Sequence, residues 1–305
     1  MLSSLAMSRF PSTLLVCMVA FLTLATVGHA QVPQAQALTR TATAPPPPAL
    51  IDQALQRMYN SDFPSANAIL DEQLRREPDN PLGHSMRAAA CLYAEFDRLG
   101  VLESQFFSDD EKVTDHKRFK PDAALKARLF ASTGEARRKA QARLTTNPSD
   151  RDAMLAMCMT AGLETDYATL VEKSYLRGYS LSKESQFYAR KLLTLDPPVF
   201  DAYLTLGSVE YVVSNLNWFF RLFVRFERIE GSKEKSIADL KKVIDGGRYY
   251  VPMAKILLSL VYLREHHDHE ALALLKDLER EFPENRLFRT EVARVGSRIA
   301  RSRPG

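Results

Sequence analysis

The chain has little of what marks a redox protein, a nucleic-acid-binding protein or one of the common enzyme classes. Three of its 305 residues are cysteines, and the formal net charge is only +4. A charge this small and this dispersed argues against nucleic acid as a partner. The sequence has no Gly-rich phosphate loop, Gly-x-Ser-x-Gly elbow, Cys-x-x-Cys pair or His-Glu-x-x-His motif. We therefore predict no enzyme activity, no catalytic residues and no cofactor.

The few cysteines are also poorly placed for chemistry. Cys17 lies inside an apolar run near the start, while Cys91 and Cys158 lie in stretches rich in Ala and Met. The last two could pair in an oxidising compartment. Because their surroundings are apolar, we favour two buried free thiols over a disulfide.

The first thirty residues are laid out as a secretory signal peptide. Arg9 precedes the apolar run at 14–27, and the small residue Ala30 closes the segment. The run is short for a membrane span, so we expect cleavage after Ala30 and a periplasmic or secreted protein, with a retained anchor as the alternative. Residues 31–48 end in four prolines, which favour an extended linker. Residues 49–305 then form the folded domain.

An internal repeat organises this domain. In three stretches a small residue is followed after twelve positions by a second small residue, and after twelve more by a proline. These residues are Ala54, Ala66 and Pro78; Ala124, Ala136 and Pro148; and Ser259, Ala271 and Pro283. The spacing predicts two antiparallel helices per unit, with a small residue where each helix crosses its partner and a proline that ends the second helix.

This pattern resembles the tetratricopeptide repeat (TPR), which has small residues at its eighth and twentieth positions and proline at its thirty-second. Tyr203, Leu206 and Gly207 match the opening of a further unit, and a weaker unit contains Ser185 and Ala189. The resemblance implies an all-α fold over residues 49–305, a right-handed superhelix of antiparallel helix pairs (α-solenoid).

The C-terminal half is also similar to a group of little-characterised, exported bacterial TPR proteins. The matching residues are a helix start at Gly231-Ser232-Lys233-Glu234 and a turn at Gly247-Arg248-Tyr249. This second resemblance implies a fold and scarcely a function.

The densest polar cluster contains His266, His267 and His269, and such a cluster invites a metal site. The repeat places it in the turn between two helices, where consecutive side chains point in different directions. We therefore predict a solvated turn without a metal, in which Asp268 caps the following helix. The charged stretch 108–121 is predicted to be a loop that interrupts the helix stack.

The segment 216–230 carries the most specific functional signal. Its arginines share one helical arc, and its phenylalanines gather on the opposite side. That arrangement suits a membrane-surface helix or a helix that docks on a partner. Packing of the aromatic side chains into neighbouring repeats is the alternative that we favour. If the segment does bind, the candidate residues are Trp218, Phe219, Arg221, Arg225 and Arg228.

Taken together, these features favour an exported TPR-like scaffold or adaptor that binds a protein or peptide in the cell envelope. One alternative is a membrane-associated protein that uses residues 216–230 for peripheral membrane contact. A less favoured alternative is an enzyme or ligand carrier whose site is dispersed over several repeats.

Overall fold

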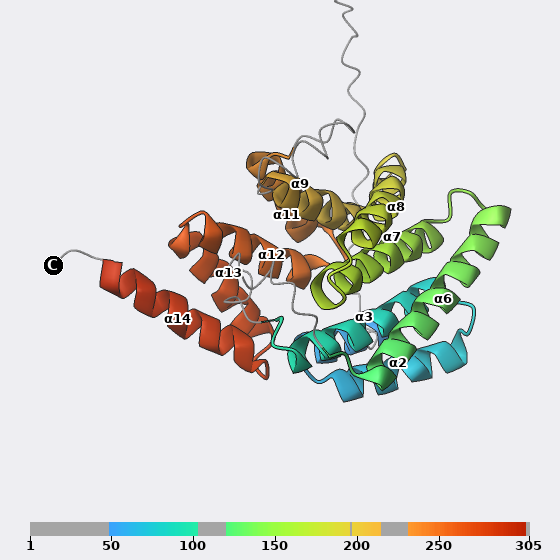
Figure 1. Cartoon of the computed structure of the whole chain (residues 1–305), viewed down its shortest axis with the longest axis horizontal. Coiled ribbons are helices and arrows are strands. Elements are labelled where there is room, and N and C mark those ends of the chain that lie inside the picture. The colour runs from blue at the N-terminus through green and yellow to red at the C-terminus, as the bar shows by residue number, and fades with distance from the viewer. Residues whose placement is uncertain (1–48, 103–119, 196, 215–230, 303–305) are drawn as a thin grey trace, which may run out of the picture. The chain divides into compact units, whose positions relative to one another are not determined.

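The computed structural model describes residues 49–102, 120–195, 197–214 and 231–302. Every regular element in these ranges is a helix (Figure 1). The α-helices are α1 (Leu50–Tyr59), α2 (Phe63–Arg76), α3 (Pro81–Arg98), α6 (Ala123–Thr146), α7 (Arg151–Asp166), α8 (Tyr175–Leu193), α9 (Tyr203–Ser214), α11 (Lys233–Gly246), α12 (Val251–Arg264), α13 (Asp268–Glu281) and α14 (Arg286–Ser302). A π-helix, η1 (Tyr167–Val171), follows α7, and a short 3₁₀ helix, η2 (Phe200–Ala202), precedes α9.

The helices are arranged as successive pairs, each packed against the next along the chain. The main interfaces join α1 to α2, α3 to α6, α7 to α8, α9 to α11 and α12 to α13, while α14 packs on α13. The predicted all-α array of helix pairs is confirmed. No helix in the described ranges is long and apolar enough to cross a membrane.

Polar residues that follow the repeat prolines cap the next helix. The side chain of Asn80 accepts from the backbone N–H groups of Leu82 and Gly83, and Asp150 accepts from Ala153 N at 2.9 Å. Such caps satisfy N–H groups that have no partner within the helix. Each repeat proline thus lies between two helices, and a capping residue two positions after it starts the second of them.

Small residues lie at most of the predicted crossings. Ala54, Ala66 and Ala271 are at most 2% exposed, and the last hairpin has the predicted turn between α12 and α13. The register of the second unit is wrong, because Ala124 is exposed and shares the single helix α6 with buried Ala136. Residues 125–135 contain no proline, so the strongest helix-ending signal is missing there. The pairing partner of α6 is α3, and the charged stretch lies between the two in sequence.

The Gly-Arg-Tyr turn between α11 and α12 is held by one carboxylate. Asp201, in η2, is 3% exposed and accepts hydrogen bonds from the backbone N–H groups of Arg248, Tyr249 and Tyr250. A Cβ atom on Gly247 would lie 2.6 Å from the carbonyl oxygen of Val243. Glycine is therefore required here because the backbone passes so close to the end of α11.

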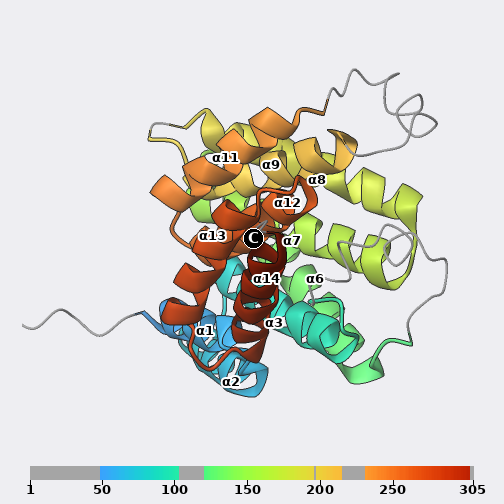
Figure 2. The same ribbon diagram turned by 90° about the vertical axis from the view of Figure 1, so that its left-hand side faces the viewer.

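The two ends of the helix array touch each other. Glu284 N donates to Asn60 Oδ1 at 3.0 Å, and Asn285 Nδ2 donates to the carbonyl of Tyr59 at 2.8 Å. The rings of Tyr59 and Phe282 lie 5.3 Å apart and belong to one apolar core with residues of α3 and α7. Figure 2 shows the α13–α14 end of the chain beside α1. Side chains therefore fill the space where the first and last helix pairs meet.

Candidate functional site

The residues that the sequence singled out for binding lie outside the described residues. Trp218, Phe219, Arg221, Arg225 and Arg228 all belong to this part of the chain, as does most of the charged stretch 108–121. Their predicted role as a partner or membrane contact stays a prediction.

His266 and His267 lie in the exposed turn before α13, and the exposed His269 lies in the first turn of that helix. His266 has a positive φ of 61°, and the ring of His267 stacks on Tyr262 at 5.8 Å. The prediction that Asp268 caps α13 is wrong. The helix already begins at Asp268, after His267, and the carboxylate of Asp268 pairs with Arg298 of α14 instead. In the described ranges no group of three or more His, Cys, Asp or Glu side chains could hold a metal ion.

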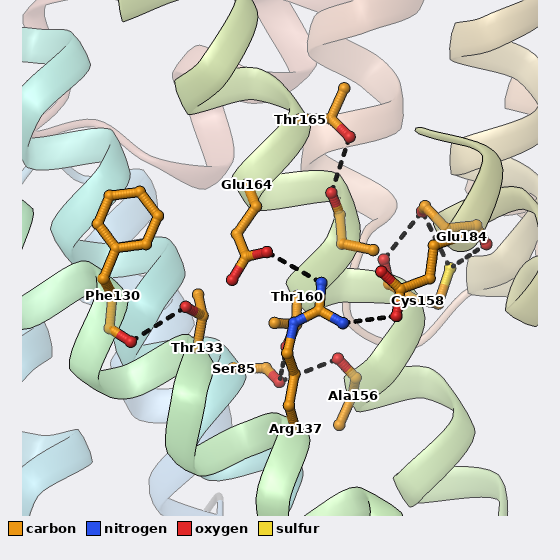
Figure 3. Close-up of polar contacts among 12 residues, drawn as sticks. Ser85, Phe130, Thr133, Arg137, Ala156, Cys158, Thr160, Glu164, Thr165 and Glu184 are labelled. Atoms are coloured by element: carbon orange, nitrogen blue, oxygen red, sulfur yellow. Dashed lines mark hydrogen bonds and ion pairs between the residues drawn. The ribbon is translucent and has the colours of Figure 1, made fainter. Parts of the chain in front are cut away.

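An inner polar network joins the helices around α7. Figure 3 shows the guanidinium of Arg137, on α6, between the carboxylates of Glu164 on α7 and Glu184 on α8. The N–O distances are 2.9 Å to Glu164 and 2.5 Å to Glu184. Earlier along α7, Ser85 Oγ of α3 donates to the carbonyl of Ala156 at 3.3 Å (Figure 3). These contacts satisfy polar groups at helix crossings, so we assign them to the fold.

The cysteines also belong to these crossings. Cys158 Sγ lies 3.4 Å from both the carbonyl oxygen of Ser185 and Thr205 Oγ1, and Ser185 Oγ donates to the Cys158 carbonyl at 2.9 Å. Cys91 is equally buried, and both thiols are free, which confirms the prediction of two buried free thiols. Burial raises the pKa of both thiols, which disfavours the reactive thiolate. Neither cysteine is placed to act as a nucleophile.

A different surface, the outward side of α8, has the composition of an interaction site. Ser185, Ala189 and Leu192 bury the inner side of this helix. The opposite side exposes two large apolar residues, Leu176 at 76% and Phe187 at 51%. Cationic residues share that side. The α8 outer face comprises Leu176, Lys183, Phe187, Arg190 and Lys191, all of which are exposed.

The start of α8 is fixed by its contact with the π-helix. A Cβ atom on Gly178 would lie 2.3 Å from Thr169 Cγ2, so glycine allows the two helices to approach closely. π-helical turns are rare and often occur at functional sites. Here the π-helical turn fixes where α8 starts. Leu176, the second residue of α8, lies on the outer side of the helix.

The α8 outer face is positively charged. Lys191 Nζ lies 4.7 Å from the ring centroid of Phe187, and Arg190 donates to the neutral side chain of Gln186 at 3.0 Å. The only carboxylate of α8 belongs to Glu184, and Arg137 already pairs with it. Arg190 and Lys191 lie in the last turn of α8, where the helix dipole interacts favourably with positive charge. Their exposure still leaves the charges available to a partner.

Sequence reasoning missed the α8 outer face, although a signal for it was present. The repeat pattern contains Ser185 and Ala189 in a weaker unit, and small residues at such positions mark the buried side of a helix. Leu176 and Phe187 lie on the other side. Exposed apolar residues could therefore have been inferred from the repeat register alone.

Comparisons with known proteins find similar solved structures but show no family for this chain. No family model and no curated protein matches this chain. It is similar to the crystal structure of a thermophilic TPR protein of Thermus thermophilus, with 13% identity, a TM-score of 0.45, and coverage of 81% of this chain and 96% of that chain. It is also similar to a tetratricopeptide repeat protein from Parabacteroides merdae ATCC 43184, with 17% identity, a TM-score of 0.29, and coverage of 81% and 97%. Because both TM-scores are below 0.5, the description of the fold rests on the helix pairs of this chain.

Proposed function

We propose that this protein is an exported, non-enzymatic scaffold that binds a protein partner in the cell envelope through the α8 outer face. The exposure of Leu176 and Phe187 among cations is the observation that carries the proposal. Aromatic residues and arginine are enriched where proteins bind one another, and an exposed aromatic ring offers a large contact area.

The arrangement of the helices supports a scaffold. Successive helix pairs place the outer sides of their second helices in solvent, so such an array offers a long surface without one deep pocket. Polar groups inside the described part, such as Arg137 and Cys158, are engaged at helix crossings. These groups stabilise the packing of the helices, so we assign partner binding to the outer surface.

Export is tested by N-terminal sequencing of the native protein. The proposal rests on Arg9, the apolar run 14–27 and Ala30. We expect the mature chain to begin at or near Gln31 and to occur in the envelope or the medium. An intact Met1 on a cytosolic protein would contradict export.

Binding is tested by site-specific photo-crosslinking in the native host. A photoreactive amino acid is placed at position 187 on the α8 outer face or, as a matched control, at the exposed position 273 on α13. We expect a discrete protein adduct from position 187 and none from position 273. Lipid adducts alone at position 187 would support the membrane-associated alternative, and no adduct there would contradict the proposed function.

A further inference from the structure

The geometry of the α8 outer face points to the chemistry of its partner. We propose that this face binds an acidic, amphipathic helix of another protein, an inference that rests on the function proposed above. The partner is identified by the spacing of the exposed apolar residues and by the sign of the charge around them.

The apolar residues match the repeat of a helix. Leu176 and Phe187 are eleven residues apart on α8, which is about 16 Å along the axis at 1.5 Å per residue. Residues at i, i+4, i+7 and i+11 share one side of a helix. A partner helix lying along α8 can therefore place an apolar residue against each of the two anchors. Docking of an amphipathic helix through such spaced anchors is a common mode of recognition.

The charges select an acidic helix. Arg190 and Lys191 form no ion pair with a carboxylate among the described residues, and they contact Gln186 and the ring of Phe187 instead. Acidic residues beside the apolar contacts of the partner would meet these cations, and complementary charge raises both the association rate and the specificity.

A protein helix fits this face better than a membrane does. A helix that lies in the membrane surface buries a continuous apolar stripe. On α8 the positions between Leu176 and Phe187 on the same side are Ser180 and Lys183, which are both exposed and polar. The two apolar anchors are therefore separate contacts, as in a packed helix pair.

The test uses the full mature chain and a synthetic probe. The probe is a fluorescent helical peptide with leucine along one side and glutamate elsewhere, and a second peptide has lysine in place of glutamate. The double variant Arg190→Glu, Lys191→Glu is compared with the control Lys241→Glu, Lys276→Glu, which makes the same charge change at exposed positions of α11 and α13. We expect the α8 variant to weaken binding of the acidic peptide roughly tenfold or more, and the control to weaken it less than about threefold.

The apolar anchors are tested by Leu176→Ser with Phe187→Ser. Both side chains are largely exposed, so the melting temperature should stay near that of the wild type while binding falls by a similar factor. Equal binding by the α8 variant and its control, or equal binding of the lysine peptide, would overturn the inference. So would binding to phosphatidylcholine–phosphatidylglycerol vesicles that depends on Arg190 and Lys191 when the acidic peptide does not bind.

The two proposals fail separately. If the Arg190→Glu, Lys191→Glu chain retains the protein adduct from position 187, the acidic-helix inference is wrong and the scaffold proposal stands. If position 187 of the wild type gives no adduct, the proposed function itself is wrong.

Discussion

Replacing Asp201 by alanine should destabilise the protein through a turn far along the chain. Its carboxylate accepts from three backbone N–H groups, at 3.0 Å for Arg248 and 2.8 Å for Tyr249 and Tyr250. Asp201 is 3% exposed, so the truncated side chain would leave these donors with limited access to water. An unsatisfied buried donor costs roughly 1–3 kcal/mol, and relaxation of the turn recovers part of this, so we expect a total loss of about 3–5 kcal/mol.

Two measurements check this expectation. Urea denaturation gives the free energy of unfolding of Asp201→Ala, with Asp245→Ala as a control because Asp245 is exposed at the end of α11, beside the same turn. Hydrogen exchange should show lost protection at the amides of residues 248–250 in the Asp201 variant alone. Asp201→Asn retains one acceptor oxygen and should lose less, about 1–3 kcal/mol. If Asp201→Ala unfolds within about 0.5 kcal/mol of the control, the carboxylate does not hold the turn.

Two further predictions concern other parts of the helix array. Ala271→Leu should overpack the α12–α13 crossing and cost roughly 1–3 kcal/mol in thermal unfolding, whereas Ala273→Leu on the exposed side should be nearly neutral. Asn285→Ala removes the hydrogen bond to the end of α1 and the cap of α14, so it should lower stability by about 1–3 kcal/mol. The control Asn147→Ala removes only an exposed hydrogen bond to Ser149 N and should cost less. Equal losses would mean that the ends are not joined.

Local signals account for the parts of the fold that the sequence predicted correctly. Pro283 and the caps at Asn80 and Ser232 act on the backbone within a few residues, so their effects follow from residue type. The failed register at Ala124 has an equally physical cause. A spacing of twelve residues fits one long helix as well as a hairpin, and only the packing of α3 against α6 distinguishes the two.

The candidate site was harder to predict from the sequence than the fold was. Its buried side could be inferred from Ser185 and Ala189, but the pairing of Glu184 with Arg137 could not, because Arg137 lies on another helix. That ion pair neutralises the only carboxylate of α8, so the remaining charges on its outer face are positive. The surface charge of a helix thus depends on which of its side chains a neighbouring helix engages.

The sequence by itself determined the helical class, the α1–α2 and α12–α13 pairs and the small residues at their crossings. These features depend on periodicity, on caps and on contacts between helices that are close along the chain. Tertiary structure alone decided that α6 pairs with α3, that Asn60 and Asn285 join the two ends, and that Asp201 binds a turn 47 residues away. Contacts between such distant residues depend on the summed crossing geometry of all the helix pairs between them, and no short stretch of sequence contains that sum.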